Sequence, residues 1–184
     1  MTEQQIINSC QKWNLEFFSI LYEKYFEEIY KFIYLKTFDK ETAQDICSET
    51  FFKAINKINS FKNEENSNFR AWIYRIAYNL VIDNYKQNNE DLSLEYAYEI
   101  WNNKDFWEDF DNKQKIKKVL KYLDKINPKH KQIIIMRIWD DLSYSEISQV
   151  TWESLDNCKK VVSRTLAKIP SEILLLAIIL SLKI

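Results

Sequence analysis

The chain has 184 residues, which allows one large domain or two small helical domains. Hydrophobic residues make up 46% of the chain and charged residues 29%, a composition that excludes an intrinsically disordered protein and predicts a globular, soluble one. The formal net charge of −1 gives no overall cationic signal for a nucleic-acid partner.

The first half of the chain is dominated by helical periodicity. Apolar residues recur at three- and four-residue steps in Phe18–Lys36, in Thr42–Phe61 and in Phe69–Lys86, and each run predicts a helix. In the third run we expect Phe69, Trp72, Ile73, Ile76, Ala77 and Leu80 to face the core. The segment Lys62–Asn68 is polar, rich in asparagine and without periodicity, so it predicts a loop.

Charge then changes abruptly along the chain. Residues 1–88 carry 11 basic and 12 acidic side chains, residues 89–112 carry 1 basic and 8 acidic, and residues 113–184 carry 14 basic and 7 acidic. The acidic segment 89–112, with its scattered aromatic residues, predicts a linker that docks on a partner surface. A basic module behind an acidic linker indicates a nucleic-acid partner better than the total charge does.

The second half begins with a predicted helix over Lys113–Ile126, and Pro128 is expected in the first turn of the next helix, where proline is favoured. The apolar tail, Ser171–Ile184, is shorter than the roughly 20 residues that a transmembrane helix needs. We expect the tail to pack on the second domain; contact with a membrane surface or a partner is the alternative.

A helix-turn-helix arrangement is predicted between these segments. Ser143 and Glu146 have the spacing of a capping box at the start of a short helix over Ser143–Val150. A turn at Thr151–Ser154 and a longer helix over Leu155–Ile169 follow.

No alternating strand pattern of useful length appears, so the predicted fold class is all-α. We expect two small helical domains, residues 1–88 and 113–170, joined by the acidic linker 89–112 and followed by the tail 171–184.

The inventory of reactive groups argues against an enzyme. His130 is the single histidine and lies in a Lys-rich stretch at a helix start, where we expect it to face solvent. A glycine-rich phosphate loop is impossible without glycine, and no Asp/Glu/His cluster has metal-ligand spacing. Cys10, Cys47 and Cys158 are far apart and odd in number, so neither zinc nor a disulfide framework is expected. We therefore expect no catalytic residue, metal or cofactor.

The N-terminal residues lack the basic and apolar regions of a signal peptide, so a reducing cytoplasm is the expected location.

The absence of glycine is itself informative. The chain has no glycine, two prolines and 22 lysines against 4 arginines, which indicates a very AT-rich gene. Six tryptophans contrast with this composition, because the standard tryptophan codon is not AT-rich. A genetic code in which UGA specifies an amino acid would explain the contrast. If UGA specifies glycine in the source, some of these tryptophans stand where the natural chain has glycine.

Three segments resemble conserved region 2 of extracytoplasmic-function (ECF) sigma factors: Leu21–Tyr34, Asp39–Ala54 and Phe69–Asp83, the last with the specific run Phe-Arg-Ala-Trp-Ile-Tyr-Arg-Ile-Ala. Pro128–Ile169, with its run Leu-Ser-Tyr-Ser-Glu-Ile-Ser, resembles their region 4 less specifically. The resemblance spans residues 15–169. It implies that region 2 docks on a coiled coil of the largest polymerase subunit and captures the melted −10 element, whereas region 4 contacts the −35 element as duplex. The acidic linker would thread near the active-site and RNA-exit channels.

The resemblance assigns candidate residues to each task. Core-polymerase binding falls to a polar stripe on the second helix: Asp45, Glu49, Phe52 and Lys53. Capture of the −10 element falls to the third helix and its preceding loop, where aromatics interleaved with cations suit unstacked bases and phosphates: Asn66, Asn68, Arg70, Tyr74, Arg75, Tyr78, Asn79 and Lys86. Contact with the −35 element falls to the last helix: Asn157, Lys159, Lys160, Ser163, Arg164 and Lys168. A solvated helix face and a merely flexible loop are the alternatives for the first two sets.

The last helix departs from the family pattern at three places. Trp152 stands where the family usually has glycine in the turn, and a bulky residue that needs positive φ there is strained. Asp156 replaces a small residue, and Lys160-Val161 replaces a Ser-Arg pair. Recognition of the −35 element is therefore the weaker half of the hypothesis.

The sequence thus predicts an alternative sigma factor whose partners are core RNA polymerase and promoter DNA, with an anti-sigma factor as a further candidate. One alternative is a diverged member that binds polymerase without selecting promoters. The other is a plain helix-turn-helix regulator that uses only residues 113–169.

Overall fold

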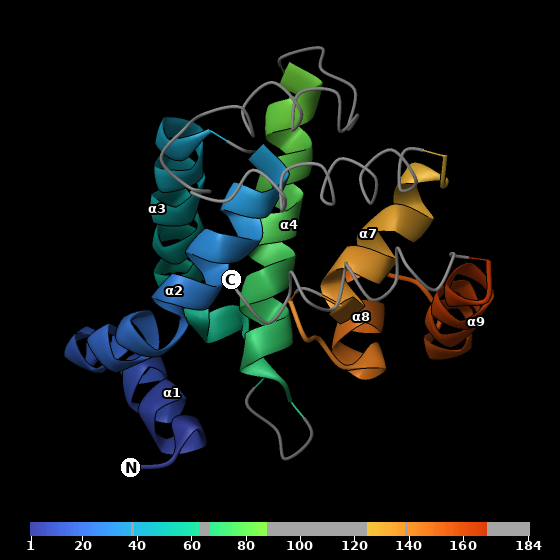
Figure 1. Cartoon of the computed structure of the whole chain (residues 1–184). Coiled ribbons are helices and arrows are strands. Elements are labelled where there is room, and N and C mark those ends of the chain that lie inside the picture. Colours follow the sequence, from blue (N-terminus) through green and yellow to red (C-terminus); the bar gives the residue numbers. More distant parts are fainter. Residues whose placement is uncertain (38, 63–66, 88–124, 139, 169–184) are drawn as a thin grey trace, which may run out of the picture. The chain divides into compact units, whose positions relative to one another are not determined.

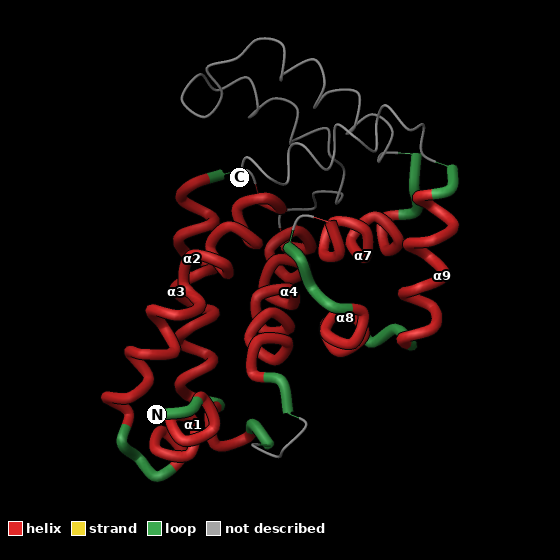
Figure 2. The backbone as a smooth tube through the Cα atoms, turned by 60° about the horizontal axis from the view of Figure 1, so that its bottom comes forward, coloured by secondary structure: helices red, strands yellow, loops and turns green. Residues whose placement is uncertain are grey.

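The computed structural model describes residues 1–37, 39–62, 67–87, 125–138 and 140–168, and the chain divides into two compact units, Met1–Asn88 and Asn89–Ile184 (Figure 1). All regular elements in the described ranges are helices, which confirms the all-α fold class (Figure 2). The predicted linker 89–112 and tail 171–184 lie outside the described residues. So does the predicted helix after the linker, except that Lys125 and Ile126 form a turn and a bend.

The N-terminal unit is built around α2 (Phe18–Thr37), α3 (Lys40–Asn56) and α4 (Phe69–Gln87), which pack against one another pairwise (Figure 1). Their amphipathic spacing buries one apolar face of each helix. The fully buried side chains include Leu21, Ile29, Phe32 and Ile33 of α2, Ala43, Cys47 and Ala54 of α3, and Phe69, Ile73 and Ala77 of α4. All three helices were predicted, but α3 ends at Asn56 and a separate 3-10 turn, η2 (Ile58–Ser60), follows it.

The face that α4 buries differs from the predicted one. Tyr74 is only 2% exposed, and its ring meets Phe32 edge to face with 4.8 Å between ring centroids. Trp72, Ile76 and Leu80 are instead half-buried, although we expected them in the core. We assigned Tyr74 to capture of the −10 element, which needs a ring on an outer face, and that placement is wrong because α4 packs its Tyr74 side against α2.

A further helix, α1 (Glu3–Gln11), was not predicted. Thr2 and Gln5 form a capping box at its start. At its end, the Gln11 side-chain amide donates to the carbonyls of Ile58 (2.9 Å) and Phe61 (2.7 Å), which ties α1 to η2. A 3-10 turn, η1 (Leu15–Phe17), connects α1 to α2.

The C-terminal unit contains α7 (Pro128–Ile138), α8 (Tyr144–Thr151) and α9 (Leu155–Leu166), each packed on the other two. Their shared core comprises Ile133, Ile134, Met136, Leu142, Ile147, Val150, Cys158, Val161 and Val162. The short helix, tight turn and second helix confirm the predicted helix-turn-helix arrangement.

The start of α8 confirms the predicted capping box. Ser143 Oγ accepts from the backbone N–H of Glu146 (3.2 Å), and Glu146 Oε2 accepts from the backbone N–H of Ser143 (2.8 Å). Two N–H groups that would otherwise lack partners at the helix start are thereby satisfied.

Candidate nucleic-acid interface

The exposed side of α3 carries the four residues that were assigned to polymerase binding. Because α3 buries Ala43, Cys47, Thr50 and Ala54, the stripe Asp45, Glu49, Phe52 and Lys53 faces outward. The Phe52 ring is 62% exposed, which is unusual for a side chain of this size. Glu49 and Lys53 form an ion pair of 3.4 Å, but an exposed i,i+4 pair contributes little stability. The stripe therefore offers an apolar anchor with carboxylates beside it.

Arg70 and Tyr74, near the start of α4, make contacts within the protein. Arg70 Nε lies 2.9 Å from Glu28 Oε2, and the Arg70 guanidinium lies 5.2 Å from the centroid of the Tyr74 ring. The Tyr74 hydroxyl also donates to Glu28, at 3.5 Å. Arg70 and Tyr74 therefore join α2 to α4, and Tyr74 is too buried to stack on a base.

The loop before α4 contributes a cap. Asn68 Oδ1 accepts from the backbone N–H of Ala71 (2.9 Å), which satisfies one of the first N–H groups of the helix. Asn68 thus has a structural task that the sequence analysis did not assign to it. Asn66 lies outside the described residues.

Further along α4, a stripe of polar side chains reaches solvent. Arg75, Asn79 and Lys86 follow one another at positions i, i+4 and i+11, which share a helix face. Asn79 and Lys86 are exposed, whereas Arg75 and the neighbouring Tyr78 are half-buried. This stripe combines an amide, two cations and a phenol, groups that suit bases and phosphates, with the exposed carboxylate of Asp83 one turn beyond Asn79.

The turn between α8 and α9 is anchored by Glu153. Its carboxylate pairs with Lys129 of α7 and accepts from the Asn157 side chain at 2.7 Å. These two hydrogen bonds, with that to Lys129 first, lower the pKa of Glu153 below its usual value. Ser148 Oγ donates to the Glu153 carbonyl at 2.6 Å, so the turn is held from both helices and from α7.

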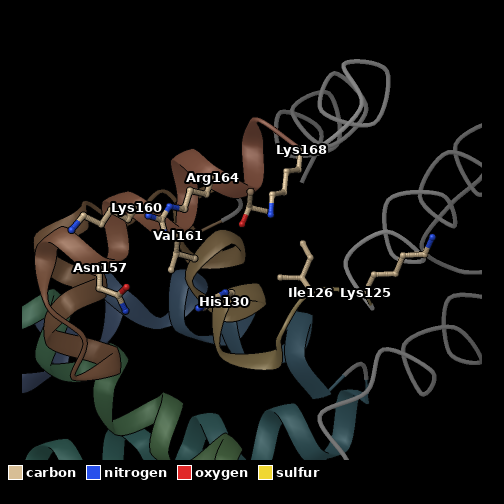
Figure 3. A pocket seen from close by; sticks show the side chains of 9 residues that line it. Lys125, Ile126, His130, Asn157, Lys160, Val161, Arg164 and Lys168 are labelled. Carbon is tan, nitrogen blue, oxygen red and sulfur yellow. The ribbon is translucent and has the colours of Figure 1, made fainter.

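One face of α9 borders a cationic hollow of about 410 Å³ (Figure 3). Its polar lining comes from Lys125, His130, Asn157, Lys160, Arg164, Thr165 and Lys168, with Ile126 and Val161 as apolar members. Four of the six residues assigned to the −35 element therefore line the hollow. The other two, Lys159 and Ser163, are exposed outside it, and His130 faces solvent as expected. Among the described residues the lining combines several cations with no carboxylate, which favours an anionic group such as phosphate.

Two carboxylates that position candidate side chains, Glu28 and Glu153, were not predicted from the sequence. Glu28 lies 42 residues before Arg70, and no local spacing signals such a pair. Only the i,i+4 spacing of Glu153 and Asn157 was visible in the sequence. In the described part of the chain, no group of three His, Cys, Asp or Glu could hold a metal ion. None of the described helices is long and apolar enough to cross a membrane.

Residues 21–90 match the family model for sigma-70 region 2. The RNA polymerase sigma factor YlaC of Bacillus subtilis (strain 168) is 29% identical over 152 residues, which cover 78% of this chain and 84% of YlaC. The ECF RNA polymerase sigma factor BldN of Streptomyces coelicolor is 27% identical over 171 residues, which cover 90% of this chain and 64% of BldN.

Two solved structures share the fold. CnrH, in complex with the cytosolic domain of CnrY, matches with a TM-score of 0.66 and 18% identity, over 90% of this chain and 93% of CnrH. The sigma factor RpoE of Bartonella quintana, in complex with the anti-sigma factor NepR, matches with a TM-score of 0.56 and 18% identity, over 86% of this chain and 95% of RpoE.

Proposed function

This chain belongs to the sigma-70 family as an ECF-type sigma factor, and from that premise we propose that it directs promoter-specific initiation by capturing the melted −10 element and contacting the −35 element. A protein of this family is a transcription initiation factor and not an enzyme. One observation carries the proposal: within residues 21–90, α3 and α4 present exposed side chains of the kinds that polymerase docking and strand capture need.

Docking on core polymerase is assigned to the α3 stripe. A basic coiled coil of the largest subunit would meet the carboxylates of Asp45 and Glu49, and the exposed Phe52 ring, about one turn beyond Glu49, would supply an apolar anchor. Aromatic anchors commonly dominate interface energies, while charged rims steer association. Phe52 is therefore the residue of this stripe whose truncation should weaken binding most.

Capture of the −10 element is assigned to the outer stripe of α4. Asn79 is exposed and has the hydrogen-bonding groups to hold a base that has left the stack. Arg75 and Lys86 lie on the same face, where they would neutralise backbone phosphates, and Tyr78 would offer a ring beside them. Tyr74 has no part in this proposal, because it is buried against α2.

Contact with the −35 element is assigned to α9, the second helix of the helix-turn-helix. Lys160 and Arg164 lie on the side of α9 that borders the hollow, and Lys168 follows the end of the helix (Figure 3). Lys159 is exposed next to Lys160 in the chain. These cations would bind phosphates flanking the groove, and Asn157 and Ser163 would lie near base edges. Asp156 places a carboxylate in the first turn of α9, next to Asn157, and this negative charge opposes close approach of a phosphate there.

The domain boundaries and partners belong to the same proposal. We assign residues 1–88 to region 2 and residues 113–170 to region 4. We also propose that the protein acts in the cytoplasm, where core polymerase acts. An anti-sigma factor is a candidate partner, because one solved neighbour is in complex with an anti-sigma factor and the other with a cytosolic domain.

A test with one variant for each surface separates the three tasks. Purified core polymerase would be titrated with the full chain and with Phe52→Ala, Asn79→Ala and Arg164→Ala, together with Gln44→Ala as a control at an exposed α3 position outside the stripe. We expect Phe52→Ala to weaken core binding, Asn79→Ala to abolish permanganate reactivity of the melted −10 bases, and Arg164→Ala to reduce protection of the −35 region.

Other outcomes would favour the alternatives. Core binding without promoter melting by the unmutated chain would indicate a polymerase adaptor. Binding to duplex DNA without binding to core would indicate a plain helix-turn-helix regulator.

A further inference from the structure

Two of the three tryptophans in the described residues occupy unusual backbone positions. Trp13 has φ of 70° and Trp152 has φ of 61°, both in the left-handed region. The only other residue with positive φ in the described part of the chain is Asp141, and aspartate visits this region more readily than most residues with a β-carbon. For a side chain as bulky as tryptophan, a single such position is an outlier, and this protein has two.

At position 13 the backbone forms the helix ending that normally carries glycine. The Trp13 N–H donates to the carbonyl of Cys10 (3.1 Å), and the Asn14 N–H donates to the carbonyl of Ser9 (3.1 Å). With α1 ending at Gln11 and capped by Lys12, these two bonds are the pair that defines a Schellman motif. Its left-handed residue is usually glycine, because glycine lacks the β-carbon that clashes with the backbone.

Position 152 has the same role in the C-terminal unit. Trp152 follows the last residue of α8 with φ of 61° and ψ of 21°, a left-handed conformation. Two residues later, Ser154 caps α9 by accepting from the backbone N–H of Asn157 at 3.1 Å. The residue at 152 therefore reverses the chain between the two helices of the helix-turn-helix and sets the direction in which α9 leaves the turn.

Both tryptophan side chains are largely exposed, so burial of the ring does not offset the cost of the left-handed conformation. Trp13 is 78% exposed and Trp152 is 76% exposed. Trp72 differs from both, because it lies within α4 and is half-buried. The centroid of its ring lies 5.3 Å from that of Phe61 and 5.4 Å from that of Phe69. The packing of its ring explains why residue 72 is a tryptophan. At positions 13 and 152 the backbone conformation is the distinguishing feature, and that conformation favours glycine.

The composition supplies the second, independent observation. At the usual frequency of about 7%, a chain of this length would contain about 13 glycines, and this one contains none. The two positions where the described backbone most needs glycine both carry tryptophan. We propose that the natural residue at positions 13 and 152 is glycine, specified by UGA codons that the source organism translates as glycine, while Trp72 is a true tryptophan specified by UGG.

Peptide mass spectrometry of the protein purified from its source organism tests the assignment directly. We expect peptides that carry glycine at positions 13 and 152 and tryptophan at position 72, with UGA codons at the first two and UGG at the third. Tryptophan at position 13 or 152 in the natural protein would overturn the proposal. UGA at all three codons with tryptophan in all three peptides would overturn it as well, because UGA would then specify tryptophan.

Melting temperatures of single variants test whether the backbone at positions 13 and 152 favours glycine, with the chain that carries tryptophan at both positions as the reference. Trp13→Gly and Trp152→Gly should each raise the melting temperature of their unit by about 4–8 °C, because glycine removes the β-carbon from a left-handed residue. Trp13→Ala and Trp152→Ala keep a β-carbon and are the matched controls, so they should not reproduce the rise. Equal melting temperatures for the glycine and alanine variants would show that the rings and not the backbone matter, and would overturn the argument.

Discussion

The capping box of α8 gives a quantitative prediction for the helix-turn-helix. Ser143→Ala removes the hydroxyl that accepts from the backbone N–H of Glu146 at 3.2 Å. Loss of a serine N-cap costs about 0.5–2 kcal/mol. Ser143 is exposed, so water replaces part of the lost bond, and Glu146 Oε2 still accepts from the backbone N–H of residue 143. We therefore expect a loss of about 1 kcal/mol in the free energy of unfolding of the C-terminal unit.

Calorimetry of the full chain should resolve this loss as a fall of about 4–8 °C in the melting transition of the C-terminal unit, with the N-terminal unit unchanged. Ser145→Ala is the matched control, because Ser145 is exposed inside the same helix and alanine has the higher helix propensity. Equal melting temperatures for Ser143→Ala and Ser145→Ala, or a loss of stability in the N-terminal unit instead, would contradict this role of the Ser143 cap.

Three further predictions concern the N-terminal unit. Gln11→Ala removes two hydrogen bonds to backbone carbonyls and should destabilise the unit by about 2 kcal/mol in chemical denaturation, whereas Lys12→Ala at an exposed neighbouring position should not. Asn79→Ala should abolish open-complex formation with core binding and melting temperature unchanged, and Asp83→Ala should leave promoter melting intact; a fall in stability would indicate misfolding instead. Burial raises the pKa of the Cys47 thiol to about 11, so its contribution to stability should be complete below about pH 9 and decline as the pH rises toward 11. Cys47→Ser should make that decline shallower in pH-dependent unfolding curves, because the other buried groups of the unit, such as Cys10, still titrate. An unchanged decline would contradict the assignment to Cys47.

Local signals explain which parts of the fold were predictable. The capping box at Ser143, the tight turn and the amphipathic runs of α2, α3 and α4 depend on residues close in sequence, and the structure confirms them. The helix α1 was missed although Thr2 and Gln5 carry a capping-box signature.

The orientation of α4 could not be predicted from its own residues. Trp72 and Tyr74 lie two positions apart in the helix, and therefore on nearly opposite faces. Aromatic side chains on both faces mean that periodicity alone does not select which face is buried. The choice is made by α2, where Phe32 receives the Tyr74 ring and Glu28 pairs with Arg70. These partners lie about forty residues away in the chain. The pairing of Glu153 with Lys129 joins residues that are also distant in sequence, so no local spacing signals it.

The left-handed turn at Trp152 was predictable for a different reason. The resemblance to the family placed glycine there, and the structure confirms positive φ at that residue. The same agreement could not be anticipated for Trp13, because neither its helix nor the Schellman motif was recognised in the sequence.

Run-off transcription with purified core polymerase tests the central claim most directly. Core enzyme would be combined with genomic promoter fragments from the source organism, with and without the full chain. A promoter-specific transcript that depends on the added chain, and that Asn79→Ala abolishes, is the predicted result. Core polymerase that binds the chain yet yields no specific transcript from any fragment, or that fails to bind it at all, would contradict the account.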